Sequence, residues 1–186
     1  MFTGTLPSEI GQLSFLEKLA IRQTNITGND LFVFMPENVY EVWGSGAPLG
    51  MSIPAEEYWP RWTNLRQLSL DDCGITGTIP TELAMLTSLD RLSLWDNKLV
   101  GTVPTELGLL QQMEHLDLED NKLTGSLPME LFALTNLKRG YFRETLLTGT
   151  IPLDFCDIPG LTRLLVNCSN IACDCCEDGD DDCPAL

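Results

Sequence analysis

The stretch LDRLSLWDNKLVGTVPTELGLL, residues 89–110, sets the pattern for the whole chain. It can be written L-x-x-L-x-L-x-x-N-x-L-x-G-x-V-P-x-E-L-x-x-L, and this pattern returns with a period of 24 residues. The first apolar position of successive copies is held by Leu65, Leu89, Met113, Leu137 and Leu161. Because so many positions match at one fixed period, we expect a repeat protein in which each copy forms one coil of a stack.

Each part of the pattern has a physical role in such a coil. The L-x-L alternation predicts a short strand with one buried face, and the side chains between the leucines point outward. The Gly and Pro positions predict a turn and the start of a short helical segment, whose N-terminus favours the acid that follows. A side chain buried at the Asn position can hydrogen-bond backbone groups of the adjacent coil, which need partners once they are buried. We expect this ladder to consist of Cys73, Asn97, Asn121 and Thr145.

The wording L-x-x-N-x-L-x-G-x-[IVL]-P-x-E-L-x-x-L resembles the plant-type subfamily of leucine-rich repeats, found in receptor-like-kinase ectodomains and polygalacturonase-inhibitor proteins. With its cysteine-rich C-terminus, the chain is most similar to secreted or membrane-tethered leucine-rich-repeat ("L domain-like") proteins of microalgae. The resemblance covers about three quarters of the chain. It implies an α/β repeat fold, a right-handed leucine-rich-repeat solenoid with a short-stranded parallel β-sheet on the concave face. It implies less about function, because such scaffolds serve many partners.

We expect a single leucine-rich-repeat domain over residues 1–186. Within it the sequence predicts partial first coils at 1–28, an irregular insertion at 29–64, four repeats of 24 residues at 65–160, and a last strand with a cysteine-rich cap at 161–186. The pattern begins in the second half of a repeat. We therefore interpret the chain as a fragment or a shortened gene model, whose missing upstream part holds a signal sequence and further coils.

The insertion at 29–64 breaks the rhythm, because the next copy starts 49 residues after Leu16 rather than 24. Its segment YEVWGSG, residues 40–46, lacks the L-x-L alternation and the Asn, so we favour a loop that leaves the solenoid over a decayed coil. Long loops inside a compact domain are often functional. The aromatic residues here either form a partner-binding flap or fold back over the neighbouring coils. They are Phe32, Phe34, Tyr40, Trp43, Tyr58, Trp59 and Trp62.

Six of the seven cysteines cluster near the C-terminus, and the seventh, Cys73, lies alone at a ladder position. An even cluster predicts a disulfide-stapled cap and an oxidising compartment. The six are Cys156, Cys168, Cys173, Cys175, Cys176 and Cys183. A zinc site is the competing interpretation, but the spacing lacks paired C-x2-C units. The sequons at Asn25 and Asn167 agree with secretion and predict glycosylation there.

Composition excludes several functions. The net charge of −16 argues against nucleic acid and against anionic membrane surfaces. No run of 18 apolar residues is present, so we expect no membrane insertion by this chain itself. The chain has one histidine, His115, and no phosphate loop, nucleophile elbow or zinc-protease motif. The acidic tail at 178–182 does not match a calcium loop. We therefore expect a protein without enzymatic activity, metal or cofactor.

Binding is then the main hypothesis, and the repeat register places it on the concave face. The third, fifth and seventh positions of each copy project from the strands onto this face. Exposed Trp, Tyr and Arg are the residue types that dominate interfaces. The candidate ligand-binding residues are Arg91, Trp95, His115, Glu119, Arg139, Tyr141 and Arg143. An ordinary solvated face without a partner is the competing interpretation.

Together these observations predict a recognition module that binds a protein, a peptide or a polysaccharide. We expect it to lie at the cell exterior, as part of an extracellular receptor-like protein. Two alternatives stay open. A secreted inhibitor of cell-wall hydrolases predicts one tight enzyme complex. A structural or adhesive component of the extracellular matrix predicts many weak contacts and no saturable site.

Overall fold

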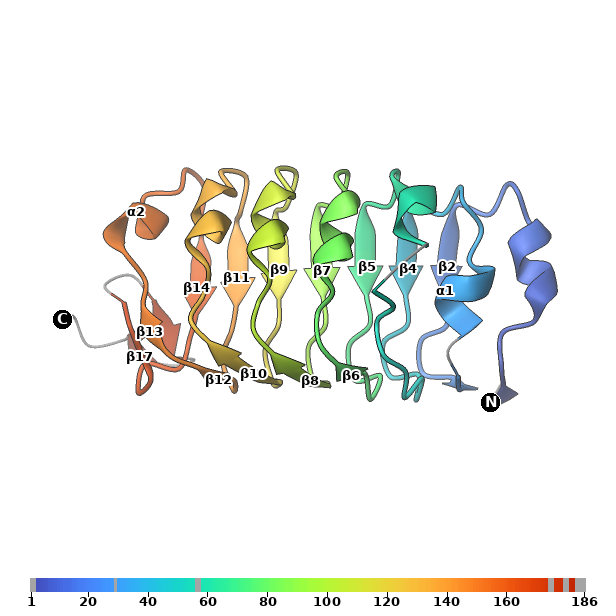
Figure 1. The fold of residues 1–186 in the computed structure, drawn as a ribbon, viewed down its shortest axis with the longest axis horizontal. Coiled ribbons are helices and arrows are strands. Elements are labelled where there is room, and N and C mark those ends of the chain that lie inside the picture. Colours follow the sequence, from blue (N-terminus) through green and yellow to red (C-terminus); the bar gives the residue numbers. More distant parts are fainter. Residues whose placement is uncertain (1–2, 29, 56–57, 174–175, 179–180, 183–186) are drawn as a thin grey trace.

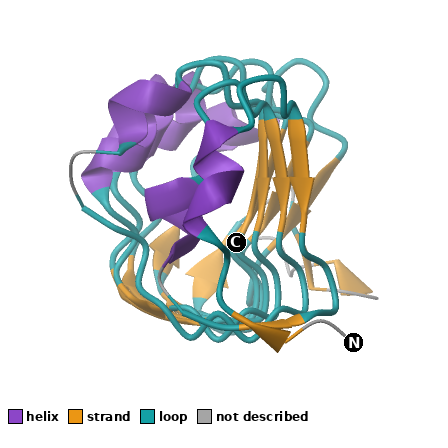
Figure 2. Ribbon diagram, turned by 90° about the vertical axis from the view of Figure 1, so that its right-hand side faces the viewer, coloured by secondary structure: helices purple, strands orange, loops and turns teal. Residues whose placement is uncertain are grey.

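The computed structural model describes residues 3–28, 30–55, 58–173, 176–178 and 181–182. Figure 1 shows a row of stacked coils, in which short strands and short helices repeat along the long axis of the molecule. Seen from the end of the stack, each coil has its helix on one side, a strand on the opposite side and a second short strand at the base (Figure 2). This arrangement is the leucine-rich-repeat solenoid that the sequence predicts.

A sheet of nine strands runs along one side of the solenoid, and we call it the long sheet. In spatial order its strands are β2 (Lys18–Ala20), β4 (Glu41–Trp43), β5 (Gln67–Ser69), β7 (Arg91–Ser93), β9 (His115–Asp117), β11 (Arg139–Tyr141), β14 (Arg163–Leu165), β16 (Glu177–Asp178) and β17 (Asp181–Asp182). Neighbouring strands are parallel except for β16 and β17. From β5 to β14 each residue pairs with the one 24 positions later. The sequence period is therefore the register of this sheet.

A second set of strands lies along the base of the coils, where the sequence predicts only a turn. Four of them form one parallel sheet: β6 (Thr76–Gly77), β8 (Lys98–Gly101), β10 (Lys122–Gly125) and β12 (Leu146–Leu147). Two further parallel pairs are β1 (Thr3–Gly4) with β3 (Asn25–Ile26), and β13 (Gly149–Thr150) with β15 (Ile171–Ala172). Backbone hydrogen bonds therefore join the coils on two sides.

The helices opposite the long sheet are short. They comprise the 3-10 helices η1 (Ser8–Gln12), η2 (Trp59–Trp62), η3 (Thr81–Met85), η4 (Thr105–Leu109) and η5 (Met129–Ala133), and the α-helices α1 (Asp30–Phe34) and α2 (Leu153–Cys156). η3, η4 and η5 each follow a proline in extended conformation and carry a glutamate in the first turn. No helix in the described ranges is long and apolar enough to cross a membrane.

The interpretation of residues 29–64 as a loop that leaves the solenoid is wrong. β4 lies between β2 and β5 in the long sheet, so this segment completes a coil. Val39 and Val42 stand where other copies have inward leucines, and both are fully buried. The sequence of this coil does not match the repeat pattern, because Gly44 also replaces an inward leucine. The Leu70 side chain occupies the space beside it, only 2.7 Å from where a Cβ of residue 44 would lie.

The aromatic residues of this segment divide between the core and the long sheet. Phe32, Trp59 and Trp62 are buried and pack on one another, with ring centroids 5.2 to 6.0 Å apart. They cover the adjacent coils and do not form a flap. Trp43 lies instead on the outer face of the long sheet, where the Arg22 guanidinium stands 4.6 Å from its ring centroid.

The ladder positions hold buried side chains that hydrogen-bond the backbone. Asn97 donates to three carbonyls and accepts from two amide N–H groups, at 2.8 to 3.2 Å. Asn121 donates to three carbonyls and accepts from one N–H group. The Cys73 thiol and the Thr145 hydroxyl donate to carbonyls only. Asparagine therefore joins neighbouring coils more completely than its replacements do.

A disulfide joins Cys173 to Cys176 in the C-terminal cap. Cys156 and Cys168 are also disulfide-bonded. The two other predicted cap cysteines, Cys175 and Cys183, lie outside the described residues. Cys73 is a free thiol, and burial raises its pKa to about 12. Because the thiolate is the reactive form, this thiol is chemically protected in the folded protein.

Candidate functional site

The long sheet arranges the candidate residues in rows across β7, β9 and β11. One row pairs in register and consists of Arg91, His115 and Arg139. In the next row Tyr141 pairs with Asp117. A third row follows the strands at the same 24-residue spacing and consists of Trp95, Glu119 and Arg143. Residues that are far apart in sequence thus form one contiguous face.

Part of this face is hollowed to about 480 Å³, and we call this depression the aromatic hollow. It is lined by Trp95, Asp117, Glu119, Tyr141, Arg143, Arg163 and Leu165. The Trp95 side chain is 43% exposed, and Tyr141 is half-buried. Of the other candidates, Arg91 is half-buried and Arg139 is exposed. Aromatic surface open to solvent among charged groups is typical of an interface.

His115 lies beneath this surface rather than on it. Its side chain is only 9% exposed, and its ring meets the Tyr141 ring edge-on, with centroids 5.2 Å apart. Its Nδ1 atom has no hydrogen-bond partner among the described residues. Burial, with help from Arg91 and Arg139, lowers the pKa of His115 to about 4. The ring is therefore neutral near pH 7 and supports Tyr141, and it offers a ligand little direct contact.

The sequence predicts Glu119 and Arg143 as separate contact residues, but in the structure they form an ion pair. The Arg143 Nε atom donates to Glu119 Oε1 at 2.9 Å, and Nη2 donates to the same oxygen at 2.5 Å. Both side chains are mostly buried, at 31% and 13% exposure. The pair fixes a guanidinium group at the wall of the hollow, where it is less free to reach a ligand.

Two carboxylates on this face were not among the candidates. Asp117 lines the hollow, and burial raises its pKa to about 7. Asp71 accepts hydrogen bonds from the hydroxyls of Ser45, Ser69 and Ser93, at 2.5 to 3.0 Å. These serines come from three adjacent coils, and their repetition beside an aspartate was the signal available in the sequence. Asp71 is therefore a structural tie between coils.

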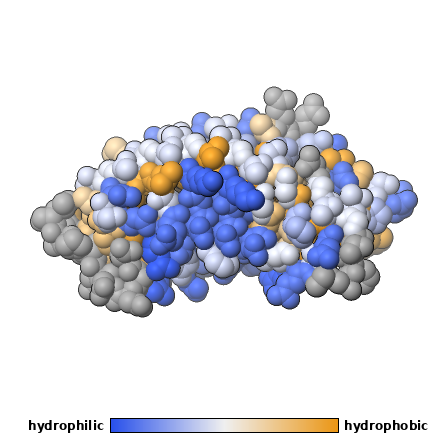
Figure 3. All heavy atoms as spheres, turned by 90° about the horizontal axis from the view of Figure 1, so that it is seen from below, coloured by the Kyte–Doolittle hydropathy of each residue, from blue (hydrophilic) through white to orange (hydrophobic). Residues whose placement is uncertain are grey.

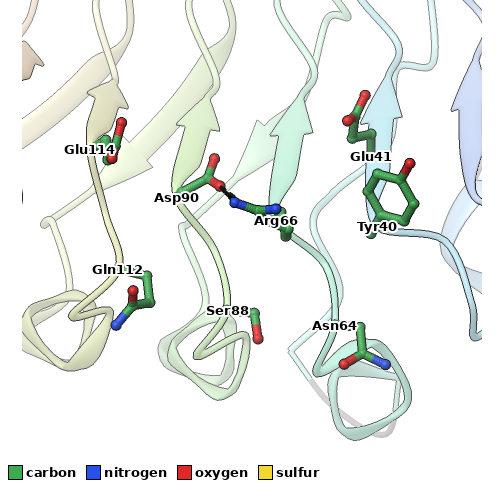
Figure 4. Close-up of a pocket in the computed structure, with 8 residues that line it drawn as sticks. All are labelled: Tyr40, Glu41, Asn64, Arg66, Ser88, Asp90, Gln112 and Glu114. Atoms are coloured by element: carbon green, nitrogen blue, oxygen red, sulfur yellow. Dashed lines mark hydrogen bonds and ion pairs between the residues drawn. The ribbon is translucent and has the colours of Figure 1, made fainter.

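A larger groove of about 840 Å³ lies at the rim of the long sheet, where β4, β5, β7 and β9 begin (Figure 4). We call it the rim groove. It is lined by Tyr40, Glu41, Asn64, Arg66, Ser88, Asp90, Gln112 and Glu114. Nearly all of these residues precede the strands, and the outward positions within the strands give no hint of them. The outward strand positions that predict the aromatic hollow therefore do not predict this groove.

The base of the solenoid is polar. Figure 3 shows strongly hydrophilic side chains gathered in the middle of this face. The acids that follow the long-sheet strands, Asp72, Asp96, Asp120 and Glu144, all have left-handed backbone, with φ of 49° to 52°. Aspartate is one of the residues that tolerate this conformation. Their backbone conformation places these acids in turns, and within the described ranges no three metal-ligating side chains cluster.

The two sequons differ in their surroundings. Asn167 Nδ2 donates to the Thr145 carbonyl at 2.8 Å, and Asn167 Oδ1 accepts from the Glu144 N–H at 2.8 Å. Its amide thus continues the ladder toward the cap. Asn25 is exposed on β3 and makes no side-chain hydrogen bond within the described ranges. Glycosylation stays a prediction, and it is sterically simpler at Asn25.

Comparison with known proteins agrees with this geometry. The family model "Leucine Rich Repeat" matches residues 64–86 and 112–134. The plant peptide hormone receptor RGFR1, solved in complex with RGF2, is 29% identical with a TM-score of 0.80, over 92% of this chain and 27% of the receptor chain. The Arabidopsis receptor kinase HAESA, solved with the peptide hormone IDA and the co-receptor SERK1, is 28% identical with a TM-score of 0.78, over 92% and 28%. A plant ice-binding protein is 26% identical with a TM-score of 0.61, over 92% and 46%.

No curated protein sequence is significantly similar to the chain. The fold and the repeats nevertheless agree with each other. The fold is a leucine-rich-repeat solenoid built from plant-type repeats, and it is similar to the solved structures of plant receptor kinases. The chain spans little more than a quarter of the length of the two receptors, at 27% and 28%.

Proposed function

We propose that the chain is a non-catalytic recognition module of an extracellular receptor-like protein, and that it binds an extended peptide or protein segment in the aromatic hollow. One observation carries the proposal. Trp95 and Tyr141, two coils apart, present aromatic surface in a hollow whose wall contains the Glu119–Arg143 ion pair. A segment that crosses the coils can stack on both rings and meet Asp117 between them. Two similar receptors are solved with peptide hormones, which supports this class of ligand.

Selection of random linear peptides on phage, followed by titration of the best binder, tests the proposal. Trp95→Ala combined with Tyr141→Ala is expected to weaken binding at least about tenfold, because buried aromatic anchors dominate interfaces. Phe15→Ala is the matched control, since Phe15 is 95% exposed and belongs to the first coil. Equal binding by the double variant, or no saturable binding by the wild type, overturns the assignment.

The open alternatives give different results. A hydrolase inhibitor forms one tight complex with a secreted glycosidase and selects no free peptide. A matrix component shows no saturable site at all. Either outcome removes the peptide-binding module from consideration.

We propose ice binding as a second candidate function, because the base of the solenoid carries exposed hydroxyl groups in rows. These residues are Thr76, Thr78, Thr102, Thr124, Ser126, Thr148 and Thr150. They occupy two positions of the repeat at 24-residue spacing, and Val100 interrupts one of the two rows. Such an array of hydroxyls and methyls can hold water molecules in a repeating arrangement. The similarity to a plant ice-binding protein supports this candidate.

Inhibition of ice recrystallisation is the measurement for this second candidate. Thr102→Lys with Thr124→Lys interrupts the rows and is expected to abolish inhibition. Thr81→Lys with Thr105→Lys adds the same charge at exposed threonines on the helix side, and should leave inhibition unchanged. Wild-type protein without activity eliminates ice binding.

A further inference from the structure

The rim groove contains a row of polar side chains that the fold does not use. In five successive coils a polar residue stands just before the first apolar position. At the two ends of this row Asn38 and Asn136 donate to backbone carbonyls of the preceding coil. The three residues between them make no side-chain hydrogen bond among the described residues, and they are Asn64, Ser88 and Gln112. The groove therefore includes the three coils in which this row is free to contact something else.

The charged groups of the groove neutralise one another. Each acid is paired with a base on an adjacent coil, as Figure 4 shows for Asp90 and Arg66. The pairs are Lys18–Glu41, Arg66–Asp90 and Lys138–Glu114, with N–O distances of 3.0, 3.1 and 2.7 Å. In each pair a single carboxylate oxygen takes the contact. The second oxygen remains available to accept a hydrogen bond, although the groove has no uncompensated charge to attract an ion.

Tyr40 supplies an aromatic wall at one end of the groove (Figure 4). Its side chain is half-buried, and the Lys18 ammonium group stands 5.4 Å from its ring centroid. The rest of the lining is amide, hydroxyl, carboxylate and guanidinium. A drug-like pocket is mostly apolar, so this lining indicates a ligand rich in hydroxyl groups.

We propose that the rim groove binds a neutral oligosaccharide that lies along the solenoid axis. Sugar hydroxyls both donate and accept, which matches carboxylate oxygens beside amide and guanidinium donors. A sugar ring has an apolar face that can pack on Tyr40. Each of three successive coils supplies one free polar group and one charged group, so a polymer can meet a polar and a charged side chain at every coil. The site is separate from the aromatic hollow and independent of the peptide ligand proposed there.

A glycan microarray probed with the full chain tests the proposal. It carries neutral β-linked hexose and pentose oligosaccharides, with uronic-acid and sulfated oligosaccharides for comparison. The best neutral ligand is then titrated by calorimetry. Asn64→Ala with Gln112→Ala is expected to raise Kd at least about tenfold, because two free amides are lost. The melting temperature should not change, since both side chains are exposed and make no hydrogen bond in the described structure.

Two controls make the result specific. Asn136→Ala changes the same row outside the groove and should bind the sugar as the wild type does. Trp95→Ala with Tyr141→Ala should also retain it, which separates this site from the proposed peptide site. Binding should be insensitive to salt, because no net charge is screened. The proposal is overturned by absence of neutral ligands, by preference for acidic ones, or by unchanged binding in the Asn64 and Gln112 variant.

Discussion

At the scale of single residues, the ladder shows how much one side chain can contribute to the joining of coils. Asn97 makes five hydrogen bonds to backbone groups, whereas Thr145 at the equivalent position makes one. The residue at the Asn position therefore determines how many hydrogen bonds this side chain makes to the backbone of its own and the neighbouring coil. Coils with Cys or Thr at this position are the weaker joints of the stack.

Replacement of these two ladder residues should have unequal costs. Asn97→Ala leaves several buried backbone groups without partners and is expected to lower the free energy of unfolding by about 3 kcal/mol. Thr145→Val keeps the side-chain shape and loses one hydrogen bond, so the expected loss is about 1 kcal/mol. Urea denaturation of both variants measures the difference. Equal losses would show that the ladder contributes through shape and not through hydrogen bonds.

His115 and Asp117 give opposite pH dependences to stability. The pKa of His115 is about 4 in the folded protein instead of 6.5. The unfolded state therefore binds a proton more readily, and the free energy of unfolding falls as pH falls through this window. The pKa of Asp117 is about 7 in the folded protein instead of 3.8, so the folded state holds a proton that the unfolded state releases. The free energy of unfolding therefore falls as pH rises through that window. In the wild type the two effects oppose each other.

Single variants should separate the two effects. Relative to the wild type, Asp117→Asn is expected to gain stability as pH rises from about 4 to 7, and His115→Gln to lose it. Urea midpoints measured across this range provide the comparison, and subtraction of the wild type removes the other carboxylates. Parallel profiles for all three proteins would contradict the assigned pKa directions.

At the scale of elements, the packing of helices on the outer side depends on one glycine. A Cβ at Gly108 in η4 would lie 2.3 Å from the Glu130 carbonyl oxygen in η5. That atom belongs to the backbone and cannot turn aside. Gly→Ala in a helix usually stabilises, but here the two coils would be forced apart.

Gly108→Ala is therefore expected to destabilise the protein by about 2 kcal/mol. Leu109→Ala is the matched control, because it changes the next residue of η4, whose side chain is 64% exposed. Thermal denaturation of both variants shows whether the close approach matters. A higher melting temperature for Gly108→Ala would mean that η4 and η5 are not packed this closely.

The elements that follow the pattern could be predicted from sequence, and the others could not. Strands β5, β7, β9, β11 and β14 coincide with the L-x-L positions. β4 was missed because Val39, Val42 and Gly44 replace leucines, and only its neighbours in space reveal its place. The second sheet was missed since its strands pair at an offset of 22 residues, as for Thr76 and Lys98, in a segment whose composition indicates a turn.

The candidate residues share the face that the repeat register predicts, but their contacts with one another do not follow from the sequence. Trp95 and Tyr141 line a hollow on the expected face. The burial of His115 and the pairing of Glu119 with Arg143 depend on side-chain packing between coils, which the period does not encode. The rim groove depends on which amides are left without partners, and this too becomes visible only in three dimensions.

At the scale of the whole molecule, the stack separates its candidate sites. The aromatic hollow lies on the long sheet, the rim groove lies where its strands begin, and the hydroxyl rows lie along the base. Each is formed by side chains from several adjacent coils. A ligand at one site therefore does not occupy the others, although all depend on the same register.

The coils are joined to their immediate neighbours by strand pairing, by the ladder and by ion pairs such as Lys138–Glu114. Under tension along the length of the molecule, the contacts between adjacent coils bear the load one after another, and we expect them to break one coil at a time. Each coil that unfolds releases 24 residues, or about 80 Å of extended chain. The disulfide between Cys173 and Cys176 prevents the short segment between these two cysteines from being extended. Because the coils repeat, we expect the molecule to lengthen under force in similar steps and not in a single transition.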